Sequence, residues 1–141
     1  MKKRENSGLY QLVLHLPRKL RIKVGGLGTF DFPAGFYVYT GSAKRGFSSR
    51  IQRHRSKVKK RFWHIDYLLA KAEIHEVRLF KNSGLSECEL ARRVACKVEA
   101  NVIAPGFGAS DCNCRSHFVY FKRREDLPLD SCNPVASDVH I

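Results

Sequence analysis

Large apolar residues alternate with other residues along the first part of the chain. The segment 8–16, GLYQLVLHL, carries a tyrosine and three leucines at every second position, which is the period of a half-buried strand, and Pro17 ends it. The alternation resumes in 20–24, LRIKV, and again in 36–41, FYVYTG, with a glycine-rich turn between these two runs. We therefore predict three strands that form an antiparallel meander.

The apolar period lengthens after the third strand. Phe47 and Ile51 recur at helical spacing, while Arg50 and His54, which are four residues apart, share another face. This pattern predicts a basic amphipathic helix. A second helix is predicted over 63–72, WHIDYLLAKA.

The alternation typical of a strand returns in 73–80, EIHEVRLF, and in 117–121, HFVYF. Between them, Ser86 is followed three residues later by Glu89, a capping box that predicts a helix over 87–98. Together these elements predict an α/β (α+β) fold with a small, mainly antiparallel central sheet flanked by helices.

The length and composition favour one compact domain. The chain has 141 residues, of which 43% are hydrophobic, and the periodic part runs from 8 to 122. The segment 123–141 is polar, contains prolines and has no period, so we expect a mobile or surface-lying tail. No apolar stretch approaches the roughly 20 residues of a membrane span, and no export signal begins the chain, so we expect a cytoplasmic protein.

The charge of the chain is strongly positive. Lysine and arginine number 26 against 13 acidic residues, for a formal charge of +13, and no acidic residue lies between Asp31 and Asp66. This predicts a polyanionic partner such as nucleic acid, although a solvated helix face or a surface for anionic lipid has the same charge pattern. The candidate contacts to nucleic acid are Lys44, Arg45, Arg53, Lys57, Lys59, Lys60 and Arg61.

Three short motifs occur in a characteristic order. The sequence Gly8-Leu9-Tyr10 on the first strand, Tyr39-Thr40-Gly41 at the end of a later strand, and Arg50 on the following helix resemble the GIY-YIG endonuclease superfamily. The segments FPAGFYVYTGSA, WHIDYLL, ECELA and GFGASDCNCRSHF are similar to a GIY-YIG-like branch, a domain of unknown function that occurs alone or fused to endonuclease III-like DNA glycosylases. Two features depart from the superfamily: the tyrosine motifs are unusually far apart, and Thr40 replaces an aliphatic residue.

The resemblance implies hydrolysis of phosphodiester bonds with the help of a divalent metal. Tyr10 and Tyr39 would then position the attacking water or accept its proton, and Arg50 would bind phosphate oxygens through its planar guanidinium. His54, one turn beyond Arg50, has a pKa suited to proton transfer. Tyr10 could instead be a core aromatic residue, and His54 a solvated residue of the helix face.

Two glycines belong to the same motifs. Gly8 and Gly41 carry no side chain, so they would let a phosphate or a neighbouring element approach the backbone closely. For Gly41, a simple turn glycine is the alternative.

Glu87 and Glu89 are the two candidate ligands for a metal. Glu89 stands at the capping-box position and Glu87 does not, so we predict Glu87 as the ligand of Mg²⁺ or Mn²⁺. Nearby candidates with weaker support are His64 and Asp111. A zinc site is a further alternative, formed by Cys88, Cys112, Cys114 and His117, although their spacing is not a common zinc pattern.

The sequence thus predicts a metal-dependent nuclease that cuts DNA, with a possible place in repair. The alternatives are a non-catalytic nucleic-acid-binding module on the same scaffold and a zinc-stabilised interaction domain. Contacts to phosphates carry no base information, so the choice between DNA and RNA, like the oligomeric state, stays open.

Overall fold

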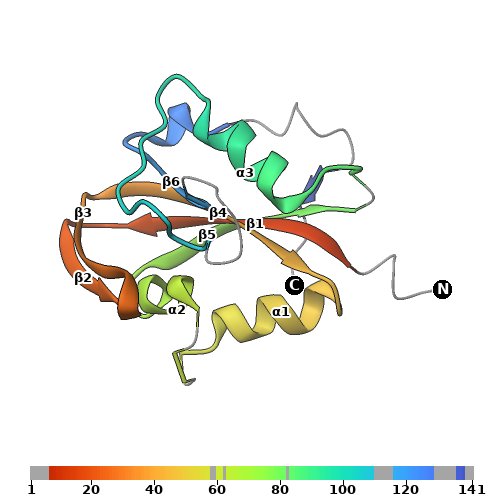
Figure 1. Cartoon of the computed structure of the whole chain (residues 1–141), viewed down its shortest axis with the longest axis horizontal. Coiled ribbons are helices and arrows are strands. Elements are labelled where there is room, and N and C mark those ends of the chain that lie inside the picture. The colour runs from red at the N-terminus through yellow and green to blue at the C-terminus, as the bar shows by residue number, and fades with distance from the viewer. Residues whose placement is uncertain are drawn as a thin grey trace.

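An antiparallel sheet of five strands forms the centre of the molecule, in the order β6-β4-β1-β5-β7 (Figure 1). The computed structural model describes residues 7–57, 60–61, 63–81, 83–109, 116–128 and 136–138. The strands of this sheet are β1 (Gly8–Leu16), β4 (Gly35–Ala43), β5 (Glu73–Phe80), β6 (Phe118–Phe121) and β7 (Ala136–Asp138). The predicted α/β class with a mainly antiparallel central sheet is confirmed.

The predicted meander is wrong in its connectivity. β1 pairs with β4 over nine residues, whereas β2 (Leu20–Val24) pairs with β3 (Gly28–Phe32) in a separate two-stranded sheet around the 3-10 turn η2 (Gly25–Leu27). β1 and β4 are buried along most of their length, so they form the middle of the large sheet. In β2 and β3, exposed residues alternate with less exposed ones, and one side of this hairpin remains in solvent.

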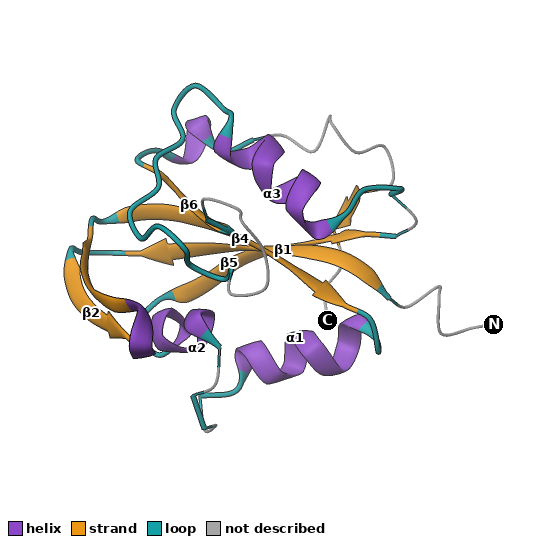
Figure 2. Cartoon of the chain, in the orientation of Figure 1, coloured by secondary structure: helices purple, strands orange, loops and turns teal. Residues whose placement is uncertain are grey.

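Helices cover both faces of the sheet (Figure 2). α1 (Phe47–Arg55) and α2 (His64–Leu69) pack on one face and enclose the larger part of the core, and α3 (Glu87–Ala95) packs on the opposite face. β1 is therefore buried on both faces, and not half-buried as its alternation predicts. The sequence pattern of β1 shows one apolar face clearly. Its other face mixes polar and apolar residues, with the buried Gln11 next to Val13.

Side chains determine where the helices begin and end. The capping box of α3 is confirmed, because the Ser86 hydroxyl accepts a hydrogen bond from the Glu89 backbone at 3.1 Å and the Glu89 carboxylate accepts one from the Ser86 backbone at 2.8 Å. α2 is shorter than the predicted 63–72. Lys57 Nζ donates hydrogen bonds to the carbonyls of Leu69 and Ala72, which satisfies acceptors that the end of the helix leaves without a partner of its own.

Part of the C-terminal segment belongs to the sheet. Residues 136–138 form β7, which pairs with β5 at the sheet edge, and a 3-10 turn, η3 (Arg124–Asp126), follows β6. No helix in the described part of the chain has the length and apolar character needed to cross a membrane.

Candidate functional site

Two tyrosines and a histidine form a buried aromatic cluster beneath α1. The Tyr10 hydroxyl lies 2.6 Å from His54 Nε2, and the ring of Tyr39 is centred 6.3 Å from that of Tyr10 and 6.1 Å from that of His54. Tyr10 and His54 are each about 1% exposed, so His54 is not a solvated residue of the helix face. The structure thus brings together three of the predicted catalytic side chains, from β1, β4 and α1.

Gly41 makes room for the Tyr10 ring. Gly41 and Tyr10 are direct partners in the pairing of β4 with β1, and a β-carbon at position 41 would lie 2.7 Å from the Tyr10 hydroxyl oxygen. Gly41 lies within a strand, so the turn-glycine alternative is excluded. The absence of a side chain at Gly41 thus leaves room for the Tyr10 ring, which belongs to the same cluster.

Gly8 has a different structural role. Its φ of +145° is rarely adopted by residues with a side chain, and an added β-carbon would lie 2.7 Å from the Phe80 carbonyl oxygen. Gly8 therefore allows β1 to begin in close contact with β5.

Arg50 lies beside the tyrosines. Its Nη1 donates a hydrogen bond to the Ser42 carbonyl at 2.8 Å, and its guanidinium carbon lies 4.5 Å from the centre of the Trp63 ring. Burial raises the pKa of Tyr10 well above its ordinary value, and the charge of Arg50 offsets this effect only in part. The pKa of Tyr39 is also raised, and burial is again the main cause. Both tyrosines are therefore neutral at neutral pH. The nearby protein groups do not bring either pKa back to its ordinary value.

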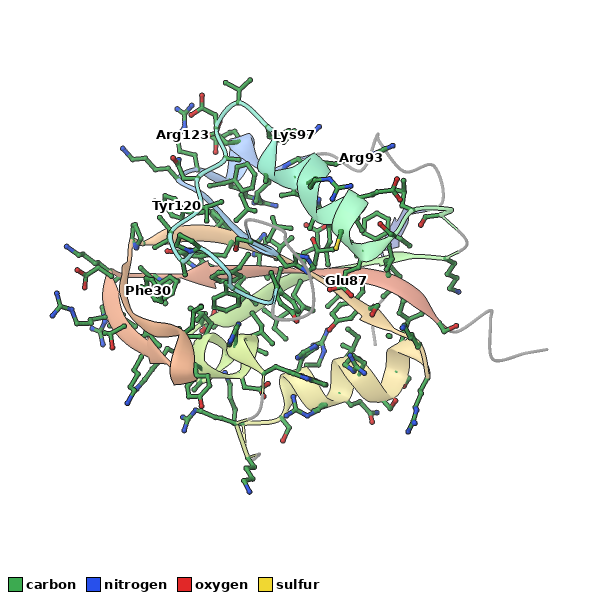
Figure 3. The ribbon with its side chains drawn as sticks, viewed as in Figure 1. Phe30, Glu87, Arg93, Lys97, Tyr120 and Arg123 are labelled. Atoms are coloured by element: carbon green, nitrogen blue, oxygen red, sulfur yellow. The ribbon has the colours of Figure 1, made fainter. Side chains whose placement is uncertain are left out.

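Glu87 reaches the same region from the opposite face of the sheet. It is the first residue of α3, where that helix comes down to the sheet (Figure 3). Glu87 Oε2 lies 2.8 Å from His117 Nδ1, and the Ser42 side chain also forms a hydrogen bond with the carboxylate. Burial would raise the pKa of Glu87, but these hydrogen bonds and the charge of nearby Lys44 outweigh burial, so its pKa lies below the ordinary value.

The negative charge of Glu87 acts on both tyrosines, because it contributes to the raised pKa of Tyr10 and of Tyr39. Glu87 is therefore near the cluster, although it projects from the other side of the sheet. The Glu89 carboxylate accepts a hydrogen bond from the Ser86 backbone N–H, so Glu89 does not belong to this cluster.

The residues present suit a metal that keeps most of its water. Within the described part of the chain, no three histidine, cysteine or acidic residues form a group that could hold a metal ion. Mg²⁺ is commonly bound through one or two carboxylates plus substrate phosphates, and Glu87, at 31% side-chain exposure, offers one accessible carboxylate. The proposed metal would have to share this carboxylate with His117.

The alternative zinc ligands are only partly placed. Cys112 and Cys114 lie outside the described residues, so the zinc prediction stays open for them. Asp111, the separate candidate for a carboxylate near the metal, lies outside them as well. Cys88 is half-buried on α3, and His117 is next to Glu87.

His64 stabilises a loop. Its Nδ1 accepts a hydrogen bond from the Gly108 backbone N–H at 2.8 Å, and its ring lies against Phe107. Burial lowers the pKa of His64, which keeps the imidazole neutral as the acceptor that this hydrogen bond requires.

The candidate nucleic-acid contacts divide into two groups. Arg53 forms an ion pair with Asp66, and the ammonium of Lys57 donates hydrogen bonds to the carbonyls of Leu69 and Ala72, so both charged groups already have partners in the protein. Lys59 lies outside the described residues. Lys44, Arg45, Lys60 and Arg61 are exposed, and Lys57 is exposed apart from these contacts.

Sequence reasoning missed three residues of this region: Trp63, Ser42 and, in its role, Asp66. Ser42 and Trp63 belong to no periodic pattern, because each acts through a contact with another element. A signal existed for Asp66, which stands three residues after Trp63, at the position from which a carboxylate reaches back to the start of a helix.

One of the comparisons with known proteins identifies a family. A family model described as "Domain of unknown function DUF123" matches residues 9–139, which include the site and strand β7. No curated protein and no solved structure matches the chain. The chain belongs to the family of the domain of unknown function DUF123.

Proposed function

We propose that this protein is a metal-dependent nuclease of the GIY-YIG type that hydrolyses phosphodiester bonds in DNA. The observation that supports the proposal best is the convergence of Tyr10, Tyr39, His54 and Arg50 beneath α1, with the charge of Glu87 acting on both tyrosines. A proton acceptor, a fixed cation and an accessible carboxylate are the groups that this reaction needs.

The Tyr10–His54 pair would transfer the proton of the attacking water. A neutral phenol is a poor base, but Tyr10 can take a proton from water as it passes its own to His54 Nε2, 2.6 Å away. His54 must then start as the tautomer with a bare Nε2. Tyr39, beside Tyr10, would help to orient the water.

Arg50 and Glu87 would act on the phosphate. The Arg50 guanidinium would donate hydrogen bonds to the phosphate oxygens as negative charge grows on them. Glu87 would hold Mg²⁺ or Mn²⁺, which, when bound, neutralises the same charge as a Lewis acid. The exposed Lys44, Arg45, Lys60 and Arg61 would bind the flanking phosphates in a salt-dependent manner.

One observation favours a second candidate, a nucleic-acid-binding module without turnover. Tyr10 and His54 are almost completely buried, and His117 is paired with the Glu87 carboxylate. Both features are compatible with a scaffold that keeps these residues for stability. Such a module would bind nucleic acid through the exposed basic residues alone.

Cleavage assays distinguish the two candidates. Labelled duplex, single-stranded and branched DNA, together with RNA, are incubated with Mg²⁺, Mn²⁺ or EDTA. A nuclease cuts at least one of them in a metal-dependent manner. Arg50→Ala abolishes this cutting. The matched control Arg45→Ala, which removes an exposed arginine, changes mainly affinity. Binding without cutting under every condition would establish the second candidate.

A further inference from the structure

Trp63 lies against two arginines of α1. The guanidinium carbons of Arg50 and Arg53 lie 4.5 Å and 4.2 Å from the centre of its ring. We propose that Trp63 is a positioning residue that holds Arg50 with its charge uncompensated, so that Arg50 and not Arg53 receives the phosphate. This inference rests on the proposed function, whose site it deepens.

Asp66 makes the two arginines different. Its carboxylate accepts two hydrogen bonds from Arg53, at 2.8 Å and 2.9 Å, and its side chain is fully buried. Planar guanidinium and carboxylate groups in this two-bond arrangement form a strong pair. The charge of Arg53 is thereby neutralised within the protein.

Asp66 also places Trp63. The same carboxylate accepts a hydrogen bond from the Trp63 backbone N–H at 2.9 Å, at the start of α2. One buried group thus ties α1 to α2 and sets the indole against α1. The Trp63 ring further contacts His54, with centroids 5.9 Å apart, so it borders the aromatic cluster as well.

Arg50 is held without a counter-charge. In the described part of the chain it forms no ion pair, and its hydrogen bonds go to two neutral groups, the Ser42 carbonyl and the Tyr10 hydroxyl. An aromatic ring attracts the face of a guanidinium group without cancelling its charge. The N–H groups point outward in the guanidinium plane, so a ring on the face leaves donors for an incoming phosphate.

Nuclear magnetic resonance of the arginine Nε–Hε groups tests this assignment without requiring turnover. The variants are Trp63→Leu and Trp63→Phe, and the control is Tyr67→Leu, the loss of another α2 aromatic ring, which contacts Arg61 and not Arg50. The phosphodiester probe is dimethyl phosphate. In wild type, Trp63→Phe and Tyr67→Leu, we expect the Arg50 signal to be shifted by the ring current of the aromatic side chain at position 63 and to respond to the probe.

In Trp63→Leu, we expect both the ring-current shift and the response of Arg50 to be lost, while the Arg53 signal stays unresponsive throughout. If Trp63→Leu does not fold, Trp63→Phe decides, because loss of the Arg50 response in this folded variant contradicts the proposal. A response of Arg53 in wild type, or an undiminished response of Arg50 in Trp63→Leu, overturns it.

Kinetics provide the second readout. Misplacement of Arg50 should lower kcat about 100-fold in Trp63→Leu with KM changed less than about threefold, since a small displacement of a catalytic group has an effect of this size. Trp63→Phe should recover most of the rate, and Tyr67→Leu should keep it. An equal loss in Tyr67→Leu would contradict a positioning role. If wild type cuts no substrate, the proposed function fails, whereas the spectra still decide which arginine binds the phosphodiester.

Discussion

The Tyr10 hydroxyl lies so close to Gly41 that a β-carbon at position 41 would approach it to 2.7 Å. The two residues face each other across β1 and β4, and the same hydroxyl reaches His54 on α1. A strand glycine thus determines where a phenol lies, and the phenol in turn connects the sheet to the helix that carries Arg50.

Gly41→Ala should therefore destabilise the protein. The methyl group has no room unless the Tyr10 ring moves, and overpacking of this kind costs about 1–3 kcal/mol. The matched control is Gly26→Ala, because a β-carbon at Gly26 meets nothing within 4 Å and should change stability little. Urea unfolding of both variants measures the difference. Equal unfolding midpoints for the two variants would contradict the close packing of Tyr10 on Gly41.

Tyr10→Phe separates stability from activity. It removes the hydrogen bond to His54 and should lower the free energy of unfolding by about 1–2 kcal/mol. Tyr37→Phe is the control. The Tyr37 hydroxyl also donates a partly buried hydrogen bond, at 2.5 Å to the Pro33 carbonyl, but it lies away from the cluster. Both variants should unfold at similar urea concentrations. Only Tyr10→Phe should lose metal-dependent cleavage, and equal activity in the two would argue against proton transfer through Tyr10.

Glu87→Gln and Glu89→Gln distinguish the two candidate metal ligands. Glutamine keeps the shape of each side chain and removes its charge. We expect cleavage to fall at least about 100-fold in Glu87→Gln, because Glu87 is the carboxylate near the tyrosines, and to persist in Glu89→Gln, whose carboxylate caps α3. Initial rates across a Mg²⁺ titration provide the measurement. The reverse order of effects would assign the metal to Glu89.

The stability of the protein should depend on His64 in mildly acidic solution. The pKa of His64 is lowered from 6.5 in the folded protein, so the unfolded chain binds a proton at a higher pH than the folded chain. The contribution of His64 is thus present above pH 6.5 and is lost as pH falls through the lower folded pKa. Urea midpoints between pH 8 and 5 should fall more steeply for wild type than for His64→Asn, which cannot be protonated. Parallel profiles would show that the hydrogen bond from Gly108 does not depend on the charge of His64.

The sequence alone was sufficient for the local elements. The two-residue period located β1, β4, β5 and β6 within two residues, and the Ser86–Glu89 capping box located the start of α3. These features depend on interactions between residues close together in the chain, which leave a readable pattern. The end of α2 was less predictable, because a hydrogen bond from Lys57, outside that helix, takes part in it.

The order of the motifs also indicated which residues would meet. Tyr10, Tyr39, Arg50 and His54 do lie in one cluster, and the capping box supported the choice of Glu87 over Glu89. The roles of the basic residues could not be read in this way. No local pattern shows that Arg53, three residues after Arg50 on the same helix, is paired with Asp66.

The sequence by itself determined strands β1, β2, β4, β5 and β6, the capped helix, the excess of positive charge and the set of side chains available for chemistry. The tertiary structure decided how these side chains are used: the Asp66 carboxylate neutralises Arg53, the Trp63 ring lies against Arg50, and His117 pairs with Glu87. Each of these relationships joins two different elements of the fold. Their geometry depends on how helices pack on the sheet, and no local periodicity encodes that packing.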